Sequence, residues 1–373
     1  MHTRWLVVAA AAGACVQVPP FRGESQPTPL LTVDKVTGQV ASTTSAPILY
    51  VVKFAASGVR TPESILVAGK EILRGGTCPF EGGVGITVYP ALTASAPALG
   101  GVDATGSLTV DWAGPVIGRV TVAWRSATYT CNARSQQAGG TSTFTMFPNG
   151  RIVRHDVATP STTAITNDSN DCGCYNDNLY NFSSFWNFQR ASQTVLPDGS
   201  AWIDGTSELA CAVYPDHTIG IGFSDAGHAR VFPDNSTAFV YDWAHEATTL
   251  APDERETTTA IVLSTASQAS QCGEVTADLA DPPISIGGIG GITSDASGVY
   301  PGPAGLTGSY EITAPVALPR GFAVSLALGA VPGVARTPAV AGDWYAAQIE
   351  GDRVLLWFRD GLAATDKITI TPR

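Results

Sequence analysis

The chain has 373 residues and a formal net charge of −11, and only 14% of its residues are charged. An acidic chain without a basic run lacks the phosphate-neutralising surface on which nucleic-acid binding depends, so this class of partner is excluded. The low charge content, together with 39 Gly and 25 Pro, is typical of an exported β-rich protein and not of a helical one.

Residues 1–14 have the pattern of a signal peptide. His2 and Arg4 give a short basic start, and Leu6–Ala14 is an apolar run too short to span a bilayer as a helix. Two cleavage patterns fit its end. In "AGAC", which is similar to a bacterial lipobox, Cys15 is lipidated and begins the mature chain; alternatively, ordinary signal peptidase cuts after the same small residues. The lipidated form predicts a bacterial outer-membrane or cell-surface lipoprotein that contacts the membrane only through this lipid.

The cysteine count favours lipidation. Seven cysteines are present, and removing Cys15 leaves six, an even number suited to disulfides in an oxidising compartment. These disulfide candidates are Cys78, Cys131, Cys172, Cys174, Cys211 and Cys272. No pairing follows from the spacing, except that Cys172 and Cys174 lie too close together to bridge each other comfortably.

Residues 15–29 are predicted to be a tether, because the stretch is rich in proline and polar residues and shows no periodicity. Residues 30–280 are predicted to form the main domain, a large antiparallel β-sandwich. Its short apolar runs are rich in Val, Thr and aromatic residues and are separated by Gly, Pro, Asn or Asp. Examples are Ile48–Phe54, Gly85–Pro90, Ser107–Trp112 and Gly118–Trp124.

Proline followed by asparagine or aspartate marks the predicted turns, because proline presets φ and the next residues tolerate turn geometry. The motifs are "FPNG" at Phe147, "LPDG" at Leu196, "YPDH" at Tyr214 and "FPDN" at Phe232. The prolines of the last three are 18 residues apart, the length of two strands with their turns. We therefore predict an antiparallel meander from Gln193 to Tyr241, and a hairpin at the first motif.

The strand after the first motif, "RIVRHDV", has two mixed faces. Alternation places Arg151, Val153 and His155 on one face and Ile152, Arg154 and Asp156 on the other. Neither face is uniformly apolar. One of them must therefore meet solvent, a cleft or a buried polar network.

The composition changes near Asp281. Residues 281–305 are dominated by Gly, Pro and Ser and are predicted to be a linker. Residues 306–373 again show strand patterns, with a hairpin turn at Gly351-Asp352, and are predicted to form a small C-terminal β unit.

Four polar residues of the main domain are candidate catalytic residues. Four histidines remain after the signal peptide: His155, His217, His228 and His245. His155 is flanked by Arg154, and His245 follows Tyr241 in "YDWAHE". Around one cleft, Arg154, His155, Tyr241 and His245 would abstract a proton next to a carboxylate and protonate a leaving oxygen. The alternative is that each is a surface or hydrogen-bonded strand residue.

The stretch Asn167–Phe188 is unusual, because Asn and Asp fill its first half and aromatic residues its second. Asp168, Asp171 and Asp177 offer oxygen ligands of the kind that Ca²⁺ prefers, although the spacing does not match an EF-hand. The favoured alternative is a disulfide-pinned surface loop with no metal.

The aromatic half of that stretch has two interpretations. If exposed, Tyr175, Tyr180 and Trp186 would form a platform that stacks on the apolar faces of sugar rings. If buried, they are core residues.

Several motifs resemble a known fold family. "LYVVKF", the "GKEIL" of Gly69–Leu73 and the "FPNGRI" of Phe147–Ile152 occur in an order similar to that of the galactose-mutarotase-like β-supersandwich. Aldose epimerases, the central domains of many polysaccharide lyases and some glycosidases share this fold. The resemblance covers about Leu30 to Ser264 and implies an all-β fold with action on carbohydrate. Such lyases carry a helical domain before the sandwich, for which this sequence has no pattern.

Together these features predict a secreted, lipid-anchored, carbohydrate-active protein that is similar to polysaccharide lyases or glycoside hydrolases. Its partner would be a polysaccharide or other glycan. The alternative is a non-catalytic cell-surface module that binds glycan or protein through the same aromatic residues, and a third hypothesis is a purely structural envelope protein.

Overall fold

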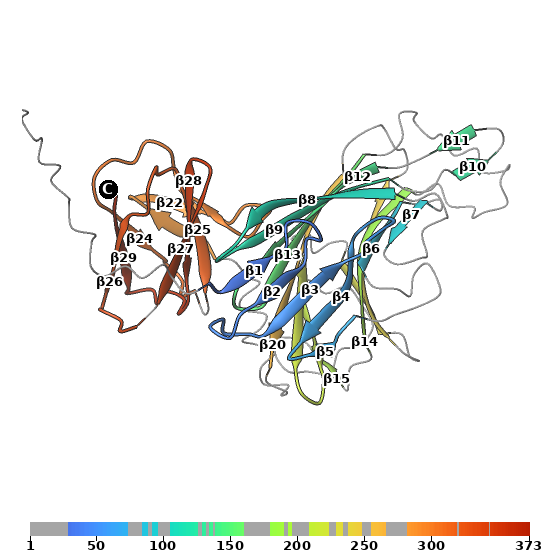
Figure 1. Ribbon diagram of the computed structural model, residues 1–373, viewed down its shortest axis with the longest axis horizontal. Helices are drawn as coiled ribbons and strands as arrows, with labels where there is room; N and C mark the ends of the chain where they lie inside the picture. The colour runs from blue at the N-terminus through green and yellow to red at the C-terminus, as the bar shows by residue number, and fades with distance from the viewer. Residues whose placement is uncertain are drawn as a thin grey trace, which may run out of the picture.

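The computed structural model describes residues 29–73, 84–88, 92–95, 105–125, 129–131, 134–136, 139–159, 180–189, 193–195, 209–223, 229–233, 238–247, 255–265, 282–318, 321–342 and 344–373. Every regular element in these ranges is a β-strand, so the prediction of an all-β fold is confirmed. Figure 1 shows a larger body of strands from the first 265 residues beside a smaller body of C-terminal strands. Within these ranges no helix is long and apolar enough to cross a membrane.

An eight-stranded antiparallel sheet forms one layer of the larger body. Its order is β15 (Gln193–Val195), β16 (Leu209–Val213), β17 (Thr218–Phe223), β20 (Arg255–Ser264), β13 (Arg151–Thr159), β12 (Gly139–Met146), β9 (Gly118–Arg125) and β8 (Thr105–Ala113). A separate hairpin joins β10 (Tyr129–Cys131) to β11 (Arg134–Gln136).

Two five-stranded sheets form the opposite layer. One contains β1 (Leu31–Val33), β2 (Val40–Ser42), β3 (Tyr50–Phe54), β4 (Pro62–Val67) and β5 (Lys70–Glu71) in that order. The other has the order β18 (Ala229–Pro233), β19 (Ala238–Ala247), β14 (Tyr180–Gln189), β6 (Val84–Val88) and β7 (Leu92–Ser95). An isolated bridge between Leu73 and Phe188 and a 2.8 Å hydrogen bond from the Gln189 N–H to the Ile72 carbonyl join the two sheets.

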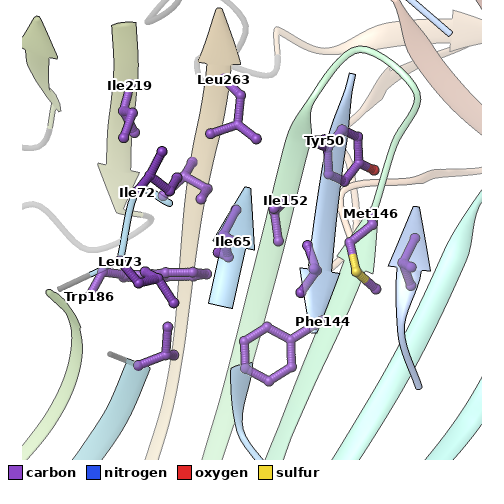
Figure 2. Packing of buried hydrophobic residues seen from close by; sticks show 14 of the residues in the cluster. Tyr50, Ile65, Ile72, Leu73, Phe144, Met146, Ile152, Trp186, Ile219 and Leu263 are labelled. Carbon is purple, nitrogen blue, oxygen red and sulfur yellow. The ribbon is translucent and has the colours of Figure 1, made fainter. Parts of the chain in front are cut away.

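The core lies between these layers. Inward residues of the large sheet, such as Phe144, Ile152 and Leu263, pack against Ile65 and Trp186 from the other layer (Figure 2). Successive residues of a strand point to opposite faces, so one buried face needs an apolar residue at every second position. The predicted large antiparallel sandwich is therefore present.

The predicted turns at Phe147 and Tyr214 are confirmed. At the first, the Gly150 N–H donates to the Phe147 carbonyl at 3.0 Å, and Gly150 has the positive φ of 80° that the turn requires. At the second, the Tyr214 N–H donates to the His217 carbonyl at 2.9 Å and connects β16 to β17.

The meander predicted from Gln193 to Tyr241 is only partly correct. β15, β16 and β17 are consecutive neighbours, but β17 next pairs with β20, and the hairpin of β18 and β19 joins the other layer. Regular turn spacing predicts hairpins, and it carries no information about which sheet the next hairpin joins.

The smaller body is a second sandwich of two sheets. One has the order β22 (Ile289–Ile292), β21 (Ile284–Ile286), β24 (Tyr310–Thr313), β29 (Lys367–Thr371) and β26 (Gly333–Thr337). The other has the order β23 (Tyr300–Pro301), β25 (Phe322–Leu326), β28 (Arg353–Phe358) and β27 (Tyr345–Glu350).

The stretch 281–305, predicted to be a linker, contains β21, β22 and β23 of this second sandwich. Gly287 and Gly288 have φ values of 60° and 83° and form the two-residue turn between β21 and β22. Ile284 and Ile286 are buried in the core of the smaller body. The glycine-rich composition thus belongs to a tight hairpin, and the second sandwich begins near Ile284.

The two bodies pack directly on each other. Their apolar contact layer includes Val116, Phe147 and Val153 of the larger body and Leu355 and Trp357 of the smaller one.

Gln348 adds hydrogen bonds across the same contact. Its Oε1 accepts from the backbone N–H groups of Val116 and Ile117, both at 2.9 Å, and its Nε2 donates to the Ile117 carbonyl at 3.2 Å. This contact fixes the outer face of the first motif's hairpin against the second sandwich.

Candidate functional site

An arginine–aspartate pair lies inside the larger sandwich. The Nε of Arg154 is 2.7 Å from Oδ2 of Asp156, and both side chains are 0% exposed. Burial lowers the pKa of Arg154, and the charge and hydrogen bond of Asp156 oppose that change. The sequence left three environments open for the mixed faces of β13: solvent, a cleft or a buried polar network. The face that carries Arg154 meets the third, a buried polar network.

Aromatic rings surround the guanidinium group of Arg154. Its central carbon lies 5.7 Å from the ring centroid of Phe144 and 5.6 Å from that of Trp186, within cation–π range. Trp186 Nε1 donates to Thr259 Oγ1 at 2.9 Å. We call this part of the core the inter-sheet polar region; it comprises Trp124, Ser142, Phe144, Arg154, Asp156, Trp186 and Thr259.

The register of the opposite layer brings two more predicted catalytic positions to this region. Tyr241 on β19 pairs with Trp186 on β14, and His245 pairs with Phe182, four residues from Trp186. Directly paired residues, and residues an even number apart, occupy the same face of a sheet. The positions of Tyr241 and His245 are therefore on the sheet face that carries Trp186, and so is the position of Tyr180; the side chains of these three lie outside the described part.

His155 is not part of this region. As the next residue after Arg154, it lies on the opposite face of the large sheet, where its Nδ1 is 3.1 Å from Thr258 Oγ1. The prediction that Arg154 and His155 line one cleft is thus corrected. Strand alternation separates them by the thickness of the sheet.

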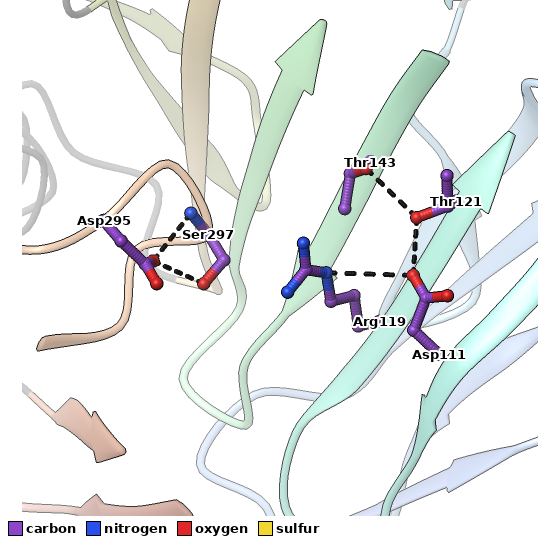
Figure 3. A network of polar contacts seen from close by, with 6 residues as sticks. All are labelled: Asp111, Arg119, Thr121, Thr143, Asp295 and Ser297. Carbon is purple, nitrogen blue, oxygen red and sulfur yellow. Dashed lines mark hydrogen bonds and ion pairs between the residues drawn. The ribbon is translucent and has the colours of Figure 1, made fainter. Parts of the chain in front are cut away.

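The outer face around His155 is a row of hydroxyl groups. His155 pairs with Thr143, and Thr143 with Thr121, across three neighbouring strands. Thr121 Oγ1 hydrogen-bonds both Thr143 Oγ1 and the Asp111 carboxylate, and Arg119 lies 3.8 Å from the same carboxylate (Figure 3). Figure 3 also shows the Asp295–Ser297 turn of the second sandwich.

For Trp186 the core alternative holds. It is fully buried, stacked on Phe188 at 6.1 Å between centroids and edge-on to Phe144 at 6.2 Å. A ring in this position has no free face for a sugar to stack on. Of the other two residues of the expected platform, Tyr175 lies outside the described residues and Tyr180 is placed only as a position on β14.

The remaining predicted sites are mostly not described. Cys211 on β16 is buried and disulfide-bonded. Cys131 is placed only as a position on β10. The cysteines Cys15, Cys78, Cys172, Cys174 and Cys272 and the calcium candidates Asp168, Asp171 and Asp177 lie outside the described ranges. Within those ranges no group of three or more His, Cys, Asp or Glu side chains is placed to hold a metal ion.

No sequence motif assigns a role to His217, which the structure places in a polar contact between the turn after β16 and strand β5. Its Nδ1 lies 2.6 Å from Asp216, whose carboxylate also pairs with Lys70 from β5. Its ring stacks on Tyr214 at 4.2 Å, and burial together with the charge of Lys70 lowers the pKa of His217 to about 4. The sequence carried one sign of this contact, because the "PDH" turn places the carboxylate of Asp216 next to His217.

Comparisons with known proteins give matches in structure only. No protein-family model matches the chain, and no curated protein matches it. Heparan sulfate lyase HepC from Pedobacter heparinus aligns with a TM-score of 0.40 and 8% identity, over 69% of this chain and 38% of the lyase. Galactose 1-epimerase from Lactobacillus acidophilus NCFM aligns with a TM-score of 0.35 and 9% identity, over 60% of this chain and 93% of the epimerase.

A third solved structure is the chondroitin AC lyase of Streptomyces coelicolor A3 in complex with chondroitin sulphate. It aligns with a TM-score of 0.33 and 10% identity, over 90% of this chain and 48% of the lyase. These are proteins of the classes that the sequence resemblance named. The chain spans 38% of the length of the heparan sulfate lyase. At these TM-scores the likeness carries no argument about activity, which must come from the side chains of this chain.

Proposed function

We propose that the protein is an exported glycan-binding β protein, and that carbohydrate enters the inter-sheet polar region when the two layers of the larger sandwich part, because the region is buried while they are in contact. The observation that carries this proposal is the fully buried Arg154–Asp156 pair between the rings of Phe144 and Trp186. A guanidinium and a carboxylate together offer the donors and acceptors that sugar hydroxyl groups need. The apolar surroundings strengthen such hydrogen bonds by excluding water.

Stability alone does not account for this pair. Moving two charges out of water is costly, and a well-packed apolar replacement of a buried ion pair is often neutral or stabilising by about 1–4 kcal/mol. Charged groups retained in such a position are candidates for a functional role. The pair therefore supports a binding site more than a scaffold element.

The binding test uses an array of neutral and uronate-containing oligosaccharides, followed by calorimetric titration of the best-retained one. The double variant Arg154→Met/Asp156→Leu removes both charges together, so no unpaired charge stays buried. We expect it to remain folded and to lose retention. The matched control is Arg336→Met/Asp366→Leu, which removes an ion pair of the same 2.7 Å length in the second sandwich and should leave retention intact. Equal retention by both variants would contradict the proposal.

Catalysis as a polysaccharide lyase or glycoside hydrolase is the second candidate function. The register positions of Tyr241 and His245, on the face opposite Arg154, favour it, because a tyrosine and a histidine supply general acid and base groups. The same oligosaccharides would be incubated with the protein and followed for ultraviolet-absorbing unsaturated products and for new reducing ends. Loss of product with Tyr241→Phe, while binding persists, would favour catalysis; binding without product from any glycan would favour the non-catalytic function.

Export and lipid anchoring belong to the same proposal and rest on the sequence pattern of residues 1–15. Expression in a bacterial host with a labelled fatty acid tests them. Label in the wild-type chain that disappears in Cys15→Ser supports lipidation, and unlabelled mature protein in the medium supports ordinary cleavage.

A further inference from the structure

Two polar atoms of the inter-sheet polar region have no hydrogen-bond partner. Ser142 is 0% and Trp124 is 4% exposed, and within the described part of the chain neither Oγ of Ser142 nor Nε1 of Trp124 has a hydrogen-bond partner. Both groups are donors, and a buried donor without an acceptor is costly and uncommon in folded proteins.

Their places in the sheet put Ser142 beside Asp156 and Trp124 one strand further away on the same face. Ser142 on β12 pairs with Asp156 on one side and with Val122 on the other. Trp124 follows Val122 by two residues, so it is the diagonal neighbour of Ser142 on the same face. Its own partner on β12 is Gly140, which carries no side chain.

The region therefore holds two donors without a partner among the described residues, of which Ser142 lies beside the guanidinium–carboxylate pair. We propose that Ser142 and Trp124 contact the bound carbohydrate, donating hydrogen bonds to its hydroxyl or ring oxygens. This inference rests on the proposed glycan-binding function and adds two contact residues to the site. In the free protein these donors are unsatisfied, so ligand binding gains their hydrogen bonds without breaking bonds to other protein groups.

The test combines two conservative variants with a matched control. Trp124→Phe removes the indole N–H and keeps an aromatic ring, and Ser142→Ala removes only the hydroxyl. Trp357→Phe is the control, because Trp357 Nε1 is also buried and unpartnered but lies in the contact layer of the second sandwich. The control thus reports the effect of shrinking a buried indole without touching the site.

The readouts are the Kd for the best-retained oligosaccharide of the array and the melting temperature of the free protein. We expect Trp124→Phe and Ser142→Ala each to weaken binding by about 3- to 10-fold, as the loss of one hydrogen bond does. Trp357→Phe should leave the Kd unchanged. Ser142→Ala should leave the melting temperature of the free protein equal or higher, because the hydroxyl it removes has no partner there.

Other outcomes separate this inference from the function it rests on. If both site variants bind like the wild type while Arg154→Met/Asp156→Leu loses binding, the added contacts are refuted and the glycan function stands. If the two site variants lose binding only in step with a lower melting temperature, as Trp357→Phe also would, they are structural residues. If the wild-type protein retains no oligosaccharide, both the glycan-binding function and the two added contacts are refuted.

Discussion

The two sandwiches each contain an arginine–aspartate ion pair of 2.7 Å, Arg154–Asp156 and Arg336–Asp366, in different surroundings. The first lies between two sheets, fully buried, with aromatic rings on the guanidinium. The second joins edge strand β26 to the residue just before β29, with side chains 7% and 11% exposed. The two pairs have the same N–O distance, so this distance does not tell their roles apart. Their positions in the fold do: the first pair is a candidate site, and the second is a contact at the edge of a sheet.

Removing one partner of each pair should give the largest difference between the sandwiches. Arg154→Ala removes the guanidinium beside the buried Asp156 carboxylate, and we expect a loss of about 3–5 kcal/mol in unfolding free energy. Arg336→Ala should cost about 1–2 kcal/mol, because residual exposure lets water reach Asp366. Urea unfolding followed by fluorescence measures both. Equal losses would mean that the two environments do not differ electrostatically.

The contact between the sandwiches can be loosened at Gln348. Gln348→Met keeps the side-chain length but leaves the N–H groups of Val116 and Ile117 without their acceptor. We expect a loss of about 2–4 kcal/mol and a separation of the unfolding of the two sandwiches into distinct calorimetric transitions.

Asn149→Ala is the control for that variant. It removes one hydrogen bond across the same contact, from Asn149 Nδ2 to the Gly321 carbonyl at 3.2 Å. A loss of about 1 kcal/mol with a single transition is expected. If the control separates the transitions as well, the contact has no special dependence on Gln348.

Histidine protonation should destabilise only the larger sandwich, because all five histidines precede residue 246. The folded pKa of His217, about 4, lies below its ordinary value of 6.5, so the unfolded chain takes up the proton first as the pH falls. The contribution is complete above pH 6.5 and is lost between 6.5 and 4, by about 1–2 kcal/mol once the opposing Asp216 carboxylate is allowed for. Unfolding of wild type and His217→Phe at several pH values measures it, and parallel pH curves for the two proteins would refute it.

The sequence predicted the strands and turns well because they depend on local chemistry. Alternation in "RIVRHDV" was enough to place Arg154 and His155 on opposite faces, and proline-asparagine and proline-aspartate turns located the hairpins at Phe147 and Tyr214. Which face of that strand is buried did not follow, since both faces are mixed and burial depends on β14, which comes later in the chain. The pairing of β14 with β6, almost a hundred residues earlier, has no local signal. This pairing helps to hold β14, and with it Trp186, in the opposite layer, and the pairing of β14 with β19 puts the position of Tyr241 on the sheet face that carries Trp186.

The smallest expected effect comes from the outer face of the large sheet, which tests whether the inner face alone carries the site. Thr121→Ala removes the hydroxyl that bonds Asp111 and Thr143 in a partly exposed network. We expect a change in unfolding free energy within about 0.5 kcal/mol, as for most surface substitutions, and an unchanged Kd for the array oligosaccharide. If Thr121→Ala weakens glycan binding while Arg154→Met/Asp156→Leu does not, the site lies on the His155 side of the sheet. The buried ion pair would then be a structural residue pair like Arg336–Asp366.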